Sequence, residues 1–214
     1  MGGEVKRSPR PAKGRGDQAR ATRRRIIAAA TELFTEYGYI STTLEQIAEG
    51  AGVAVQTVYF HFGNKRTVLK GALDVAAVGD DQPVPVLERP WLHEARAATD
   101  PNRVVALWVD ASRAILDRGA PLMRVLRDAA TADPDMAALW ATNEQQRDIS
   151  YRVMAQQLAD LDALRADVHL EQAADVLFAL LSFEMYSVLT TTRRWTPQQF
   201  QQWMIDTIGT TLLR

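Results

Sequence analysis

The chain has 214 residues, enough for one or two domains with a buried core. Of these residues 47 % are apolar and 24 % are charged, a composition that argues against a disordered protein. It contains no cysteine, which excludes disulfides, thiolate catalysis and cysteine-bound metal. We find no run of about 18 apolar residues and no signal-peptide pattern, so we expect a cytoplasmic protein without a transmembrane helix.

The net charge of −1 hides an uneven distribution along the chain. Residues 1–70 carry twelve Lys and Arg against six Asp and Glu, whereas the remaining residues carry thirteen against twenty. A basic end of this kind favours contact with a polyanion such as nucleic acid. A solvated tail that aids solubility would have the same charge, so charge alone leaves both interpretations open.

The N-terminal third begins with a segment, residues 1–18, that is rich in Gly, Pro, Lys and Arg and is expected to be a disordered basic arm. From about residue 20 the apolar residues recur in steps of three and four, which predicts a helix ending at Gly38. Two short helices should follow, the first capped by Thr43 and the second covering about residues 54–60.

The helical pattern continues to the end of the chain. We expect a helix over about residues 64–78 and then a proline-rich loop over residues 79–90, which is either a hinge between lobes or a surface connection. Asp-Pro pairs at residues 100 and 133 mark helix starts, and Gly119 and Pro121 should separate two helices between them. Residues 170–192 and 197–213 are predicted to form one helix each, with no strand of useful length anywhere.

Two short helices joined through a glycine are typical of a helix-turn-helix, whose second helix enters the major groove of DNA. The segment Thr42–Lys70 reads TTLEQIAEGAGVAVQTVYFHFGNKRTVLK, and over about residues 20–73 the chain resembles the TetR (tetracycline-repressor-like) family. The resemblance implies an all-α fold. Its parts would be the arm (1–18), a three-helix DNA-binding domain (19–66) and a helical ligand-binding and dimerisation domain (67–214).

The resemblance also implies which residues contact DNA. Ala54, Val55 and Gln56 would face base edges, where Gln56 could bond an adenine and the other two could touch thymine methyl groups. The remaining expected contacts are to phosphates, from the residues Arg20, Arg24, Thr42, Thr43, Thr57, Tyr59, His61 and Lys65. We further expect the arm to lie along the minor groove or the phosphates.

The C-terminal body is expected to hold a small, largely apolar effector and to form the dimer. Large aromatic faces with polar tips suit a ligand cavity, and the candidate lining residues are Trp108, Met123, Trp140, Asn143, Arg147, Tyr151, Phe178 and Tyr186. The resemblance places the dimer interface on the last two helices, with Leu177, Leu181, Phe200, Trp203 and Met204 as candidates. Each of these residues could equally belong to a plain hydrophobic core.

These observations predict a ligand-responsive transcriptional regulator, and most members of the family are repressors that an inducer releases from a palindromic operator. The expected partners are double-stranded DNA, a small-molecule effector and a second copy of the chain, with no cofactor and no membrane. A helical dimer that acts only through protein partners is the alternative. An enzyme is disfavoured because no nucleophile elbow, phosphate-binding glycine loop or metal-ligand spacing is found.

Overall fold

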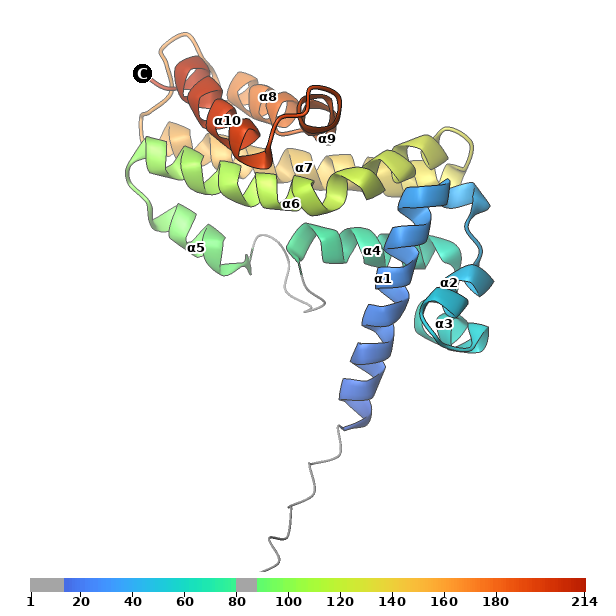
Figure 1. The fold of residues 1–214 in the computed structure, drawn as a ribbon. Coiled ribbons are helices and arrows are strands. Elements are labelled where there is room, and N and C mark those ends of the chain that lie inside the picture. Colours follow the sequence, from blue (N-terminus) through green and yellow to red (C-terminus); the bar gives the residue numbers. More distant parts are fainter. Residues whose placement is uncertain (1–13, 80–87) are drawn as a thin grey trace, which may run out of the picture.

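The computed structural model describes residues 14–79 and 88–214 and confirms an all-α architecture (Figure 1). Residues 1–13 of the expected arm and most of the expected loop over 79–90 lie outside the described residues. The helices are α1 (Arg15–Ser41), α2 (Leu44–Gly50), α3 (Val55–Phe62), α4 (Lys65–Val78), α5 (Pro90–Ala97), α6 (Pro101–Ala130), α7 (Pro134–Asp160), α8 (Leu170–Leu180), α9 (Phe183–Ser187) and α10 (Pro197–Leu212).

Helix α1 starts earlier than the sequence predicts, because residues 15–18 of the expected disordered arm are helical. Asp17 lies in the first turn, where a negative charge favours the helix N-terminus, and it forms a 2.9 Å ion pair with Arg20. The helical path is broken at Gly38, as expected, since this residue adopts a positive φ of 79°. One further turn then leads to Ser41.

Most of the predicted helix starts are confirmed. Thr43 and Thr196 each form a complete capping box, and Asn64 accepts a hydrogen bond from the backbone of the first turn of α4. Asp100 and Asp133 cap α6 and α7, each with a proline at the start of the helix. These signals are local, so the sequence suffices to place them.

The expectation that Gly119 and Pro121 separate two helices is wrong, since α6 runs unbroken from Pro101 to Ala130. Proline inside a helix removes one backbone hydrogen bond and costs about 3 kcal/mol. Buried apolar side chains lie on both sides of it, among them Leu116, Leu122 and Leu126. Their packing outweighs the local cost.

The expected single helix over residues 170–192 is also wrong. Helix α8 stops at Leu180, and Ser182 caps the short helix α9, which passes into a π-helical turn over Val188–Thr192. Tyr151 donates a hydrogen bond of 2.9 Å to the carbonyl oxygen of Leu181, which satisfies a backbone group freed by the break. The change of direction lets Phe183 point into the core, where it is 3 % exposed.

By length and composition the stretch Leu170–Thr192 could cross a membrane, although the sequence was expected to hold no such helix. The break between α8 and α9 interrupts this stretch, and its inward side packs into the core. Only 33 % of its window is buried inside the chain. The core helix of a helical body can have the same length and composition.

Two hydrophobic cores hold the molecule together. One lies in the body between α5, α6, α7, α8 and α10, which run close together in Figure 1. The other holds α1 to α4 and includes Leu122, Leu126 and Ala129 of α6 together with Met136 of α7. The N-terminal helices are therefore packed on the C-terminal half of α6, and a shift of α6 would be felt in both lobes.

Candidate DNA-binding surface

Helices α2 and α3 form the expected helix-turn-helix. Gly52 lies in the turn between them with a positive φ of 63°, a conformation that favours glycine. Ala54 is the N-terminal cap of α3, and Val53 donates a backbone hydrogen bond to the carbonyl of Ala48 across the turn. The local geometry thus fixes the angle between the two short helices.

Helix α3 has one buried face and one exposed face. Val58 and Phe62 are 0 % and 5 % exposed and anchor the helix to the N-terminal core. Ala54 and Gln56 are exposed and Val55 is half-buried, so the beginning of α3 presents its side chains outward. An exposed, anchored helix of this kind is the part of a helix-turn-helix that fits the major groove.

The exposed face also holds two aromatic side chains. Tyr59 is 49 % exposed, as expected for a contact with DNA, and Phe60 is 85 % exposed. Phe60 was not among the expected contacts. The four-residue spacing of the inward Val58 and Phe62 nevertheless predicts that the three residues between them turn away from the core. The His61 ring stacks edge-on against the Phe60 ring, with 5.3 Å between ring centres. His61 and Thr57 are both half-buried.

Thr42 and Thr43 have different environments. Thr43 is exposed at the start of α2, where its hydroxyl accepts a hydrogen bond from the backbone of Gln46. Thr42 is 0 % exposed, and its hydroxyl donates to the carbonyl oxygens of Gly38 at 2.8 Å and Leu33 at 3.2 Å. The expectation that the Thr42 side chain contacts phosphate is therefore wrong, because it stabilises the broken end of α1.

Lys65 is also engaged within the protein. Its Nζ atom donates to the carbonyl oxygens of Tyr39 at 2.7 Å and Thr42 at 2.8 Å, and it lies 4.5 Å from the centre of the Tyr39 ring. Burial lowers the pKa of Lys65 below its ordinary value. The ammonium group thus links the last turn of α1 to the start of α4. Phosphate binding by Lys65 stays a prediction.

Replacing Lys65 with methionine should lower the free energy of unfolding by about 2 kcal/mol, because the carbonyl groups at the end of α1 lose their charged donor. Arginine at this position should retain part of the stability. Urea unfolding followed by circular dichroism measures both variants. Unchanged stability combined with weakened DNA binding would instead support Lys65 as a phosphate contact.

Arg20 and Arg24 lie on the outer surface of α1. Arg20 is paired with Asp17 at an exposed site, where such a pair is weak and can exchange for a phosphate. Arg23, which was not among the expected contacts, lies 4.5 Å from the centre of the Phe62 ring and packs α1 onto the end of α3. DNA contact by Arg20 and Arg24 stays a prediction.

Comparison with known proteins places this surface in a family. Residues 26–72 match the bacterial regulatory proteins of the tetR family, a range that spans the end of α1, the helix-turn-helix and most of α4. Over this range the chain resembles the TetR family. The matched helices include α3 with its exposed face.

Curated relatives resemble the chain over this N-terminal region. The uncharacterized HTH-type transcriptional regulator TtgW of Pseudomonas putida is 48 % identical over 56 residues, which are 26 % of this chain and 42 % of the relative. SrpR of Pseudomonas putida, an HTH-type transcriptional regulator, is 48 % identical over 56 residues, 26 % of each chain. The chain thus matches less than half the length of these relatives.

Solved structures extend the likeness of fold to most of the chain. The SmeT–triclosan complex has a TM-score of 0.70 at 20 % identity and covers 91 % of this chain and 92 % of its own. NalD, the secondary repressor of the MexAB-OprM multidrug efflux pump in Pseudomonas aeruginosa, has a TM-score of 0.66 at 23 % identity, with coverage of 92 % and 98 %. At this identity the likeness shows the fold alone.

In the body, the structure brings together three of the residues expected to line a ligand cavity. Arg147 donates a 3.0 Å hydrogen bond to the carbonyl oxygen of Phe178 and lies 4.3 Å from the centre of its ring. The hydroxyl of Tyr151 donates a hydrogen bond to the carbonyl oxygen of Leu181, three residues after Phe178. The Tyr151 ring packs edge-on against the ring of Phe178. These side chains support the end of α8.

The other expected cavity residues are spread through the body. Trp140 stacks on Phe183 with 5.8 Å between ring centres. The hydroxyl of Tyr186 donates a 2.6 Å hydrogen bond to Asp117, and burial together with this bond raises the pKa of Tyr186. Trp108 packs against α5, while Met123 and Asn143 are half-buried. A groove of about 610 Å³ lies elsewhere, lined by Arg96, Ile149, Arg152, Val153, Gln156, Gln157 and Asp160.

Four of the five residues expected at the dimer interface belong to the core of a single chain. Each is 0 % exposed, which contradicts their assignment to a surface between subunits: Leu177, Leu181, Phe200 and Met204. Only Trp203 is half-exposed, and it stacks edge-on with Trp195 at 5.7 Å. Half-exposed apolar side chains on α8 and α10 include Val176, Leu180, Trp203 and Ile205.

Within residues 14–79 and 88–214, no cluster of three or more His, Cys, Asp or Glu side chains is placed to hold a metal ion.

Proposed function

We propose that this chain is a cytoplasmic transcriptional repressor of the TetR family that binds a palindromic operator as a homodimer and is released by a small, largely apolar molecule. The observation that carries the proposal is the exposed face of α3, an anchored helix with polar and aromatic side chains turned outward. The transcriptional regulators named among its relatives resemble the chain in this same region.

In this proposal α3 lies in the major groove. Gln56 is exposed and its amide can form two hydrogen bonds with an adenine edge, while Ala54 and Val55 can contact thymine methyl groups. Thr43, Thr57, Tyr59 and His61 are proposed to contact the phosphates, with Arg20, Arg24 and the basic arm extending the contact along the duplex. Phe60, the most exposed aromatic side chain of α3, is proposed to join these contacts.

The proposed dimer forms through the outer sides of α8 and α10. The stretch Leu170–Thr192 is apolar enough to require cover, yet only 33 % of its window is buried in the single chain. Val176, Leu180 and Trp203 are the half-exposed apolar side chains available for a symmetric contact. A two-fold axis there would present two copies of α3 to half-sites that are related by the same symmetry.

The proposed switch acts through α4, which is held by the body at both ends. Arg118 of α6 donates a 2.8 Å hydrogen bond to the carbonyl oxygen of Ala76 near the C-terminus of α4. Near its N-terminus, Arg66 pairs with Asp135 of α7 at 2.9 Å. An effector that binds one arrangement of α6 and α7 better than another would therefore shift α3 and change the affinity for DNA.

Selection of bound sites from a random duplex library tests the proposal. We expect the wild-type protein to enrich an inverted repeat, and we expect Gln56→Ala to lose the preference at one base pair in each half-site. Glu45→Gln is a matched control, because Glu45 is an exposed residue of α2 outside the proposed contacts and its variant should enrich the wild-type motif. Recovery of the same motif with Gln56→Ala would show that Gln56 does not contact a base.

A further inference from the structure

We propose that the junction of α5, α6 and α7 binds the hydroxyl group of an apolar alcohol or phenol, between the indole nitrogen of Trp108 and the side-chain oxygen of Gln157. That such a molecule acts as the effector rests on the proposed function. Its binding does not, and can be measured without DNA.

The junction holds two buried polar atoms that lack a hydrogen-bond partner among the described residues: Nε1 of Trp108 and Oε1 of Gln157. Trp108 is only 2 % exposed, so its N–H group cannot turn to solvent. Buried polar groups without a partner are rare in folded proteins because each loses its bonds to water without replacement. One of these atoms is a donor and the other is an acceptor.

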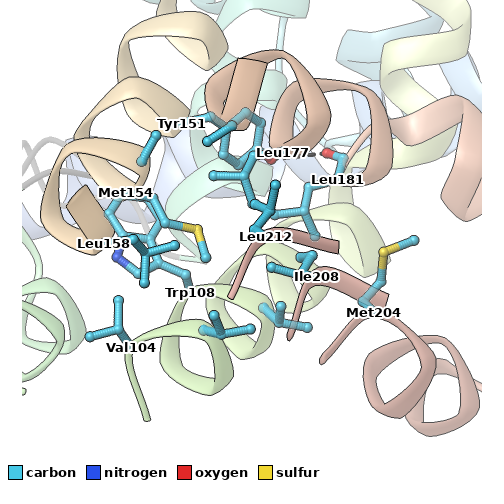
Figure 2. Close-up of a cluster of buried hydrophobic side chains, with 14 of the residues drawn as sticks. Val104, Trp108, Tyr151, Met154, Leu158, Leu177, Leu181, Met204, Ile208 and Leu212 are labelled. Carbon is cyan, nitrogen blue, oxygen red and sulfur yellow. Dashed lines mark hydrogen bonds between the residues drawn. The ribbon is translucent and has the colours of Figure 1, made fainter. Parts of the chain in front are cut away.

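Both side chains lie against the same turn of α5. The Trp108 ring packs edge-on against that of Trp91, with 5.1 Å between ring centres. Gln157 donates through Nε2 to the carbonyl oxygen of Ala95 at 2.5 Å, and Ala95 lies one helical turn after Trp91. Trp108 and Leu158, the residue that follows Gln157, belong to the same hydrophobic core, whose side chains Figure 2 shows.

The orientation of the Gln157 amide is fixed by its partner. If its oxygen and nitrogen were exchanged, two acceptor oxygens would face each other at Ala95, which is unfavourable. Oε1 must therefore remain the atom without a partner. A ligand group that satisfies the junction has to donate to Gln157 and accept from Trp108.

A hydroxyl group has one donor and two acceptor sites, which matches this requirement with a single atom. A carboxylate has no proton to donate and would be repelled by Oε1, and an ammonium group cannot accept from Trp108. The surroundings are apolar, with the rings of Trp91 and Trp108 and the buried side chain of Leu158. An apolar molecule that carries one hydroxyl therefore fits the chemistry of the junction.

A surface groove passes beside Gln157. The groove of about 610 Å³ runs along α7 beside α5, and Gln157 forms part of its lining. Val153 and the 48 % exposed Ile149 give this groove an apolar stretch along which the body of the ligand can lie. Arg152 of the same groove is already paired with Asp148 and Glu171, so it offers no free charge to an anion.

Isothermal titration with three related probes tests the proposal on the full chain. 4-Ethylphenol can donate and accept, 4-ethylanisole can only accept, and ethylbenzene can do neither. We expect 4-ethylphenol to bind about tenfold more tightly than ethylbenzene, with 4-ethylanisole in between. Gln157→Leu should abolish the advantage of the phenol over the anisole, and Trp108→Phe should abolish that of the anisole over ethylbenzene.

The ratios between probes separate recognition from a general loss of structure, which would weaken all three alike. Gln146→Leu on α7 and Trp140→Phe in the other aromatic cluster are matched controls and should keep the wild-type ratios. Equal binding of the three probes, or binding of none, would overturn the proposal and leave the two atoms as a site for a buried water. DNA binding by the same protein would be unaffected by that outcome.

Discussion

Replacing Phe200 with alanine should lower the free energy of unfolding by about 3–5 kcal/mol, the usual cost of removing a buried aromatic side chain. Phe200 is 0 % exposed within one chain and packs against Tyr186 at 4.9 Å between ring centres. The loss arises inside the subunit, so it should appear at every protein concentration. Denaturant unfolding at several concentrations, followed by circular dichroism, measures it.

Trp203→Arg is the contrasting variant, because Trp203 lies on the half-exposed side of the same helix. It should leave the subunit folded and weaken the proposed dimer at least about a hundredfold, as the loss of a central aromatic contact does in other interfaces. Ile149→Arg on α7 is the control for an added charge at an exposed apolar position. A dimer that survives Trp203→Arg in light scattering would place the interface elsewhere.

Replacing Tyr59 and Phe60 together with alanine should reduce the affinity for a selected duplex by about thirtyfold to a thousandfold, because each side chain should contribute about 1–2 kcal/mol of binding free energy. Both residues are exposed on α3, so the fold should be unaffected. Fluorescence anisotropy with labelled duplex measures the affinity, and thermal unfolding checks the fold.

Tyr37→Ala combined with Ile40→Ala is the matched control for that double variant. These two side chains are 54 % and 76 % exposed near the end of α1 and are outside the proposed contacts. We expect them to leave DNA affinity within about twofold of the wild type. Equal losses in the two double variants would indicate a general effect of surface aromatics instead of a contact made by α3.

The parts of this fold that follow local rules could be predicted from the sequence. The capping boxes at Thr43 and Thr196 and the break at Gly38 depend on residues a few positions apart. The helix-turn-helix combines such signals with a motif that many positions support. The exposed start of α3 could therefore be found without the structure, together with Gln56 and Tyr59.

The remaining features depend on contacts between distant residues. Pro121 stays inside α6 because side chains from other helices bury its neighbours. Lys65 turns inward because its ammonium group donates hydrogen bonds to the carbonyl oxygens of Tyr39 and Thr42. The apolar stripe of α8 and α10 showed that these helices need cover. It did not show that Leu177 and Phe200 face the core of their own chain, because core and interface require the same residue types.

The central claim is that α3 of a dimer binds a specific duplex, and a competition titration in about 0.15 M salt tests it most directly. Labelled duplex that carries the selected inverted repeat is displaced either by the same unlabelled duplex or by one with both half-sites scrambled. We predict a preference of about a thousandfold or more for the intact site. Equal displacement by the two competitors would contradict specific recognition by α3.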